Sequence, residues 1–239
     1  MTGLLHYRHT AQMLLRSLSL GLSQLGDRAI LWVLAKSLLV TLILTVALGI
    51  AVIWAGQTAL ARFELSEETG VLVGVALTLG VIAAAWLLFR AIAIPVINFF
   101  GDDIVLAVEA RHYPGALAAS RPMTVATGIR LGLASVGRLL LFNLLALPAY
   151  VLLLFTAIGP IILFFAINAI LLGRDLGDMV SIRHADPARR KAWLHETRVD
   201  RFILGLIVSG IFLLPFINLL APIVGAAAMT HLFHAKARS

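Results

Sequence analysis

The sequence predicts an all-α integral membrane protein, and the observations behind that prediction are its composition and the lengths of its uncharged segments. Of the 239 residues, 61% are hydrophobic and 13% are charged, and the mean hydropathy is +1.00. A soluble domain is nearer half apolar, with about a quarter of its residues charged. We expect one membrane domain over 1–239, with two full transmembrane helices plus two re-entrant helical hairpins that penetrate only part of the bilayer.

The first part of the domain is predicted to hold an interfacial helix and both full spans. In 1–28, leucines recur on one face at helical spacing, which is typical of a helix lying on the membrane surface. These leucines are Leu14, Leu15, Leu18, Leu22 and Leu25. Segment 29–55 is the first span, because a crossing needs about 20 apolar residues and this segment is uncharged after Lys36. Segment 71–94 is the second span.

The two hairpins are predicted from uncharged runs whose lengths do not fit whole crossings. Hairpin 1 covers 139–172 and hairpin 2 covers 202–234, whereas two crossings would need about 40 residues and a turn. Pro148 and Gly159-Pro160 interrupt the first run, and we place its tip near the second of these. Leu214-Pro215 breaks the second run. Irregular backbone at this depth is tolerated only where protein buries it or where it lines a wet cavity.

Two polar segments, 99–138 and 173–201, are predicted to be cytoplasmic and helical. Asp102-Asp103 precedes an apolar pattern and indicates a helix start with an aspartate cap, with a metal or acid–base pair as the alternative. Asp186-Pro187 starts a helix in the second segment. That segment carries seven basic and five acidic residues, interspersed, and we interpret it as a solvated excursion.

The placement of the basic residues predicts the orientation of the chain. The net charge is +7, yet of the 19 lysines and arginines only Arg62 lies in 56–70. Because basic residues are retained on the cytoplasmic side, we place 56–70 outside and both termini in the cytoplasm. The charge therefore indicates membrane topology and not nucleic-acid binding, with anionic lipid or an anionic solute as secondary partners.

Asparagines inside the apolar segments are candidates for a polar pathway. Asn98 and Asn218 each follow a proline by three residues, and paired proline-broken segments are typical of transporter sites. Asn143 and Asn168 lie within hairpin 1. The alternative is that these side chains only bridge helices, since an amide both donates and accepts hydrogen bonds.

The remaining sequence features argue against a metal site, thiol chemistry and enzyme activity. His231 and His234 share a helix face, but without a carboxylate nearby in the sequence we expect no metal site. Cysteine is absent, which excludes thiol catalysis and thiolate metal ligands. Nucleotide-binding and hydrolase motifs are also absent, so we expect neither an enzyme nor a cofactor.

Three pieces of sequence carry a resemblance to a known family. They are Ile167 to Asp175 (INAILLGRD), Leu214 to Pro222 (LPFINLLAP), and Pro95 to Asn98 (PVIN) followed by Glu109-Ala110-Arg111. In order and spacing they cover roughly 12–234. The chain resembles the etoposide-induced-protein/CysZ family of bacterial inner-membrane proteins. The resemblance implies two long helices plus two partly penetrating hairpins, homo-oligomers and, in one branch, sulfate permeation.

The resemblance also implies an anion-binding motif, Gly-x-Arg-Arg, just before the first long helix. The matching positions are Gly26, Asp27, Arg28 and Ala29, so Gly26 and Arg28 carry over as candidate anion-binding residues. Ala29 replaces the second arginine and Asp27 adds a carboxylate beside the site. Both departures weaken an anion site, because a bidentate donor is lost and a like charge is gained.

These interpretations combine into one functional hypothesis. We expect an oligomeric permease or channel for a small inorganic anion, sulfate-like, passive or ion-coupled, in the bacterial inner membrane. Arg28 would capture the anion at the helix start. The candidate pathway residues are Asn98, Glu109, Arg111, Asn168, Arg174 and Asn218. The alternative is a non-transporting membrane scaffold or assembly protein of the same fold.

Overall fold

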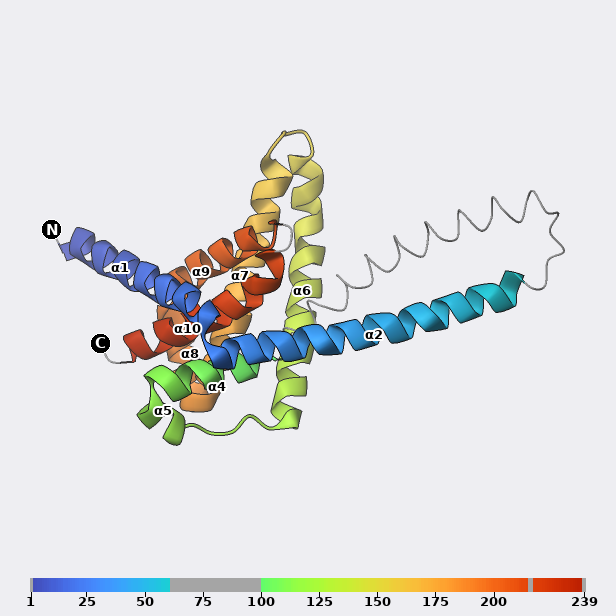
Figure 1. Cartoon of the computed structure of the whole chain (residues 1–239). Coiled ribbons are helices and arrows are strands. Elements are labelled where there is room, and N and C mark those ends of the chain that lie inside the picture. The colour runs from blue at the N-terminus through green and yellow to red at the C-terminus, as the bar shows by residue number, and fades with distance from the viewer. Residues whose placement is uncertain (1, 61–99, 215–216, 238–239) are drawn as a thin grey trace. The chain divides into compact units, whose positions relative to one another are not determined.

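The computed structural model describes residues 2–60, 100–214 and 217–237, and every regular element in them is helical (Figure 1). In chain order the elements are α1 (Thr2–Ser23), η1 (Gln24–Gly26), α2 (Arg28–Leu60), α4 (Gly101–His112), α5 (Pro114–Ala118), α6 (Val125–Leu153), α7 (Gly159–His184), α8 (Pro187–Glu196), α9 (Arg198–Ile211), η2 (Ile217–Leu220) and α10 (Ala221–Lys236). The chain divides into two compact units. One unit combines residues 1–30 with 101–239, and the other is 31–100.

Helix α2 accounts for the first predicted span. It runs for 33 residues from Arg28, and the stretch Arg28–Ala51 is long and apolar enough to cross a membrane. Such a helix is about 50 Å long at 1.5 Å per residue, so it exceeds the roughly 30 Å of the hydrocarbon core. The second predicted span, 71–94, lies outside the described residues.

Helices α6 and α7 form the first hairpin, whose tip is drawn at the top of Figure 1. The turn occupies 154–158, and α7 begins at Gly159 with Pro160 in its first turn, where a proline is tolerated because its missing N–H would be unpaired anyway. Two expectations are corrected. Pro148 lies inside a continuous α6, and the two helices extend beyond 139–172 to Val125 and His184.

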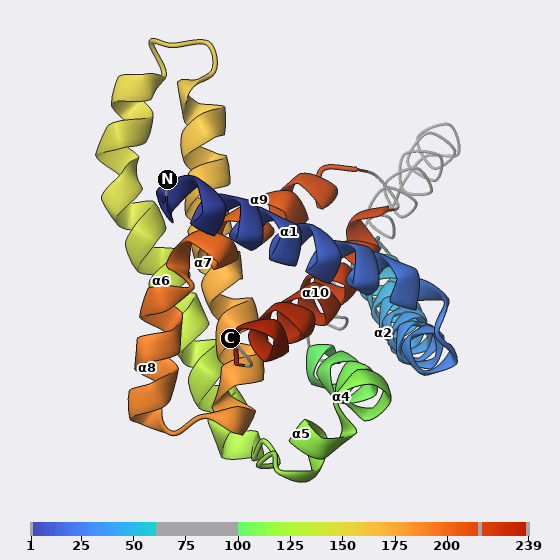
Figure 2. The ribbon, with the colours of Figure 1, turned by 90° about the vertical axis from the view of Figure 1, so that its left-hand side faces the viewer.

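The second hairpin contains two short helices, α9 and α10. The break predicted from the proline phrase is present, because α9 ends at Ile211 and α10 begins at Ala221 after the short η2. Helix α10 is buried along nearly its whole length, from Ala221 to His234. It packs against α1, α4, α7 and α9, and Figure 2 shows it surrounded by these helices.

Glycines allow α7 and α9 to approach closely. A Cβ added at Gly173 would lie 2.1 Å from the Arg201 carbonyl oxygen, and one at Gly205 would lie 2.2 Å from the Ala169 carbonyl oxygen. A side chain at either position would therefore force the two backbones apart. Small residues at helix crossings are common in membrane proteins for this reason. This contact fixes the positions of the charged side chains around the start of α9.

Helix α1 packs on α10 with a face that differs from the predicted leucine face. Its described buried side chains are Leu14 and Ser17, followed by Gln24 of η1, and a Cβ at Gly21 would lie 3.1 Å from the Ala228 backbone nitrogen. Leu15 and Leu22 are exposed. Small and polar residues thus make the helix contact because they permit a close approach. The exposed leucines still fit the prediction of an interfacial helix.

The prediction that the charged segment 173–201 is a solvated excursion is wrong, because part of the segment packs within the protein. Its first part continues α7, and four of its charged side chains are buried: Asp178, Arg183, Asp200 and Arg201. Arg183 pairs with Asp102 in the first turn of α4, and Asp200 pairs with Lys236 at 3.0 Å. Asp102 therefore serves an ion pair between helices instead of the predicted cap. Charges can be buried here because each has an opposite partner or backbone carbonyls. Asp186 caps α8 as predicted.

Candidate functional site

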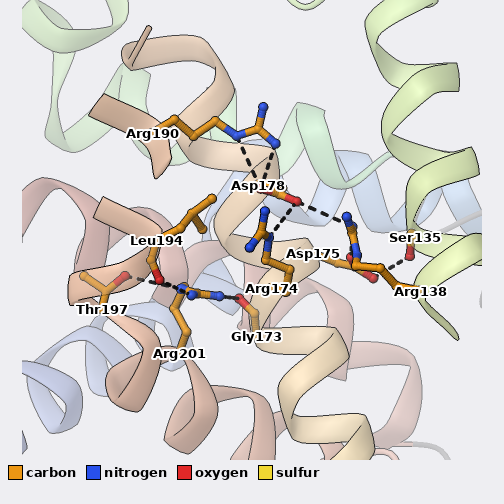
Figure 3. Close-up of polar contacts among 10 residues, drawn as sticks. All are labelled: Ser135, Arg138, Gly173, Arg174, Asp175, Asp178, Arg190, Leu194, Thr197 and Arg201. Atoms are coloured by element: carbon orange, nitrogen blue, oxygen red, sulfur yellow. Dashed lines mark hydrogen bonds and ion pairs between the residues drawn. The ribbon is translucent and has the colours of Figure 1, made fainter. Parts of the chain in front are cut away.

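A buried carboxylate organises the charged cluster where α6, α7 and α8 meet. Asp178, on α7, accepts hydrogen bonds from Arg174 at 3.2 Å and from Arg190 on α8 at 2.8 Å (Figure 3). Arg138 on α6 lies 3.4 Å from the same carboxylate. The Asp178 side chain is 3% exposed, and these cationic partners offset the cost of burying a carboxylate away from water.

A second carboxylate ties the cluster to α6. Asp175 accepts hydrogen bonds from Arg138 at 2.7 Å and from Ser135 at 2.5 Å. Because Arg138 contacts both aspartates, it joins α6 to α7 at the base of the uncharged part of the hairpin. The aspartates hold the arginines in fixed positions instead of leaving them mobile at the surface.

Arg201 extends the cluster onto α9. Its guanidinium donates to the carbonyl oxygens of Gly173 and Leu194 and to the Thr197 hydroxyl, as Figure 3 shows. Burial lowers the pKa of Arg201 to about 10, and the neighbouring Arg174 cation contributes in the same direction. The group still carries its charge at neutral pH. The nearby carboxylates of Asp178 and Asp200 act in the opposite direction and favour the charged guanidinium.

These side chains border a strongly basic pocket between α7, α8 and α9. The pocket has a volume of about 980 Å³. Its cationic lining is Arg174, Arg190, Lys191, Arg198 and Arg201, and its one carboxylate is Glu196. Five positive charges less one negative charge leave +4 on the lining with His195 neutral. A neighbouring pocket of about 500 Å³ also contains Arg138, Arg174, Arg198 and Arg201, but its other lining residues are apolar.

Lys191 and Arg198 are the lining cations available to a ligand. Both side chains are exposed, and within the described ranges no hydrogen bond or ion pair engages either of them. Arg174 and Arg190, by contrast, are held by Asp178. The pocket therefore combines fixed arginines with two cations that can close on an anion. Guanidinium forks bind tetrahedral oxyanions through paired N–H groups.

The motif expected to bind anions lies elsewhere, at the junction of η1 and α2. Gly26 ends η1, and Arg28 is the first residue of α2 with an exposed side chain. Asp27 between them forms an ion pair with Arg111 of α4. The structure thus brings Arg111 to this motif, but through the carboxylate that competes with an anion. The prediction that Asp27 weakens this site remains a prediction, because its carboxylate is already paired with the Arg111 cation.

Glu109, a predicted pathway residue, is enclosed within the protein. Its carboxylate has no exposed area and lies 2.6 Å from His184 Nε2 and 2.9 Å from His234 Nε2. Burial by itself raises the pKa of Glu109, but the two histidine hydrogen bonds outweigh it and lower the pKa to about 2. The group is therefore an anion at neutral pH and does not lie in the basic pocket.

Glu109 supplies the carboxylate whose absence from the nearby sequence led us to expect no metal site at the histidine pair. The sequence places no carboxylate near His234, but α4 brings Glu109 to it, and His184 arrives from the end of α7. His231, the other member of the histidine pair, instead contacts the Tyr113 hydroxyl at 2.8 Å.

The asparagines have unequal surroundings. Asn143 and Asn168 donate to carbonyl oxygens one turn earlier in their own helices, at 2.8 Å each. Among the described residues these hydrogen bonds stay within one helix, so bridging between helices by these two asparagines remains a prediction. Asn218 is buried in η2. Asn98 lies outside the described residues.

Sequence reasoning identified Arg174 but missed most of its neighbours. The Arg174–Asp178 pair has the helical i, i+4 spacing, a signal that could have been found. Arg138, Arg190, Lys191, Arg198 and Arg201 come from three helices, α6, α8 and α9, and nothing in the sequence shows that these helices converge with α7.

Comparison with protein families gives the family of the chain, which the fold and the pocket alone do not. Among curated proteins, none is similar enough in sequence to count as a relative. A family model does match, over residues 17–222, and it is described as Sulfate transporter CysZ/Etoposide-induced protein 2.4. The match includes the first hairpin, the basic cluster and the start of α10. The chain therefore belongs to the Sulfate transporter CysZ/Etoposide-induced protein 2.4 family of membrane proteins.

Proposed function

We propose that this membrane protein is a permease or channel for a small inorganic anion, sulfate-like, and that the anion binds in the basic pocket between α7, α8 and α9. The observation that carries this proposal is the pocket lining, which holds five cations and one carboxylate. Family membership supports a transport role in general. The family description joins a sulfate transporter with an etoposide-induced protein, so membership alone does not select the solute.

The chemistry of the pocket favours a divalent oxyanion. A hydrogen bond between charged groups contributes about 1.5–3 kcal/mol, more than a bond between neutral groups. Lys191 and Arg198 can supply such bonds without breaking the network around Asp178. The positive field of the fixed arginines also raises the local anion concentration. Flux through such a site would be passive or ion-coupled.

The membrane arrangement that we propose keeps two partly penetrating hairpins. In the first, the uncharged arms are 139–153 and 159–173, each 15 residues and about 22 Å long. The hydrocarbon core is about 30 Å thick, so Arg138 and Arg174 would enter it if the hairpin crossed completely. In the second, α9 has only 14 residues. The charged cluster would then lie at the cytoplasmic face of a bacterial inner membrane, with both termini in the cytoplasm.

Cysteine labelling tests that arrangement. Phe155 lies in the turn of the first hairpin and is 90% exposed, whereas a side chain at Gly159 would meet Thr156 Oγ1 at 2.2 Å. Phe155→Cys in this cysteine-free chain should resist an impermeant maleimide added outside, while Thr58→Cys, within the segment 56–70 that is predicted to lie outside, should react. Equal labelling of both would mean that the first hairpin crosses the membrane.

Sulfate flux in proteoliposomes tests the function. We expect wild-type protein to admit radiolabelled sulfate faster than empty liposomes, and Lys191→Gln with Arg198→Gln to slow that flux at least about 10-fold. The matched control is Arg121→Gln with Arg130→Gln, which removes two exposed arginines that do not line the pocket. Arg28→Ala tests the amino-terminal motif separately.

The outcomes separate the permease from the alternative. Wild-type flux equal to that of empty liposomes would favour the non-transporting scaffold. Flux that Arg28→Ala abolishes and the pocket variant leaves unchanged would move the anion site to Gly26 and Arg28. Homo-oligomer formation, which the proposal also includes, is measured on the same samples by light scattering in detergent.

A further inference from the structure

We propose that Glu109, His184 and His234 form a site for a divalent transition-metal ion, with Zn²⁺ as the expected occupant. The three side chains come from α4, the last residue of α7 and α10, and their ligand atoms all lie within 4.8 Å of one another. Two imidazole nitrogens and one carboxylate are a common ligand set of zinc sites that keep a fourth position open.

The ligand geometry needs little adjustment to hold the ion. His184 Nε2 and His234 Nε2 lie 2.6 Å and 2.9 Å from Glu109 Oε1, so all three atoms already converge on one point. Zinc binds imidazole nitrogen and carboxylate oxygen at about 2.0–2.2 Å, which separates neighbouring ligand atoms by roughly 3–3.5 Å. Small side-chain rotations would open that space. The two imidazole nitrogens lie within 4.8 Å of each other.

An unpaired buried atom is the second observation that points to a ligand. Glu109 Oε2 is buried and has no hydrogen-bond partner among the described residues. Glu109 has no exposed area, so water does not readily compensate that oxygen. A buried acceptor left unpaired is costly. The two histidine hydrogen bonds use only Oε1 and leave that cost in place. A metal ion bound by both carboxylate oxygens would remove it.

The surroundings provide an enclosing shell and an entry route. The His184 ring packs against Phe233 at 5.4 Å between centroids, and Tyr113 stacks on His234 at 4.2 Å. Aromatic neighbours fix ring orientation and limit access of solvent. A cavity of about 270 Å³, bordered by His234, Tyr113, His231, Arg16 and Ser17, reaches one of the ligands from the side of α1. Arg16 is its basic residue, and an entering cation must pass it.

Zinc titration of the full chain tests this site without any transport assay. The protein is purified in detergent, freed of its affinity tag and stripped with a chelator, and Zn²⁺ is then titrated in competition with a fluorescent indicator. We expect one Zn²⁺ per chain. Glu109→Gln, His184→Ala and His234→Ala should each weaken binding at least about 100-fold. His195→Ala is the matched control, because that histidine is exposed and outside the cluster.

Two results would overturn the proposal. One is a stripped wild-type protein that takes up no Zn²⁺, and the other is a ligand variant that binds it as tightly as wild type. If a variant does not fold, the absorption spectrum of Co²⁺ bound to the wild-type protein tests the site instead. Intense visible bands of a four- or five-coordinate ion support the site, and the weak spectrum of a six-coordinate ion contradicts it. Sulfate plays no part in either readout, so this test is independent of the proposed permease.

Discussion

Helices α6 and α10 are both apolar enough to cross a membrane, yet their surroundings are opposite. In the stretch Ile217–Lys236, 83% of the most apolar 18-residue window is buried by the protein, against 6% in Ala126–Leu153. Helix α6 exposes large residues such as Leu140, Leu145 and Leu152. Helix α10 instead holds small residues, Gly225 to Ala228, and two buried histidines. Hydropathy alone treats these helices as equivalent, but their side-chain sizes separate them.

The difference teaches what each kind of helix can do. A helix with bulky apolar residues outward is suited to lipid, because lipid tails solvate leucine as well as a protein core does. A helix of small residues admits close neighbours on every side, and buried polar groups can then be paired. The hydrogen bonds of His231 and His234 fit this description. The predictions below test whether the two helices respond as differently as this comparison requires.

The largest expected effect is the loss of a buried side chain from α10. Leu232→Ala should lower the free energy of unfolding by about 2–5 kcal/mol, because Leu232 has no exposed area and its removal leaves a cavity. Leu145→Ala on α6 is the control, since Leu145 is 70% exposed and should change stability far less. Reversible unfolding in mixed micelles measures both. Equal losses would contradict the comparison.

The second prediction makes the same glycine-to-alanine change at two positions, where it should alter the free energy of unfolding in opposite directions. Gly173→Ala places a methyl group against the Arg201 carbonyl, and we expect a loss of about 1–3 kcal/mol as α7 and α9 separate. A Cβ at Gly132 on α6 has nothing within 4 Å. Gly132→Ala should therefore gain up to about 1 kcal/mol from helix propensity. The comparison fails if both variants shift the unfolding midpoint in the same direction.

The smallest effect concerns the start of α6, which depends on local capping more than on packing. The Thr124 hydroxyl accepts a hydrogen bond from the Thr127 backbone N–H at 3.2 Å. Thr124→Ala should cost about 1 kcal/mol, whereas Thr124→Ser should retain the cap. Unfolding followed by circular dichroism measures the free energy of unfolding of each variant. A loss in Thr124→Ser as large as in Thr124→Ala would mean that capping is not the cause.

The sequence predicted the classes of segment better than their contacts. Composition and run length established an all-α membrane protein and the breaks near Gly159 and Pro215, because proline and charge act locally. They did not establish that α7 continues to His184, since a charged segment can extend a helix when its charges find partners. Asp178 shows why: its partners Arg138 and Arg190 lie 40 and 12 positions away in the chain. Glu109 and His234 are 125 positions apart, so their contact is a property of the fold.

Equilibrium binding of radiolabelled sulfate to the purified protein tests the central claim most directly. The two available cations of the basic pocket should together contribute at least about 1.4 kcal/mol, a tenfold change in affinity. Lys191→Gln with Arg198→Gln should therefore bind sulfate at least about 10-fold more weakly than wild type. Arg121→Gln with Arg130→Gln should bind it as wild type does. Equal affinity in both double variants would contradict the assignment of the anion to the pocket between α7, α8 and α9.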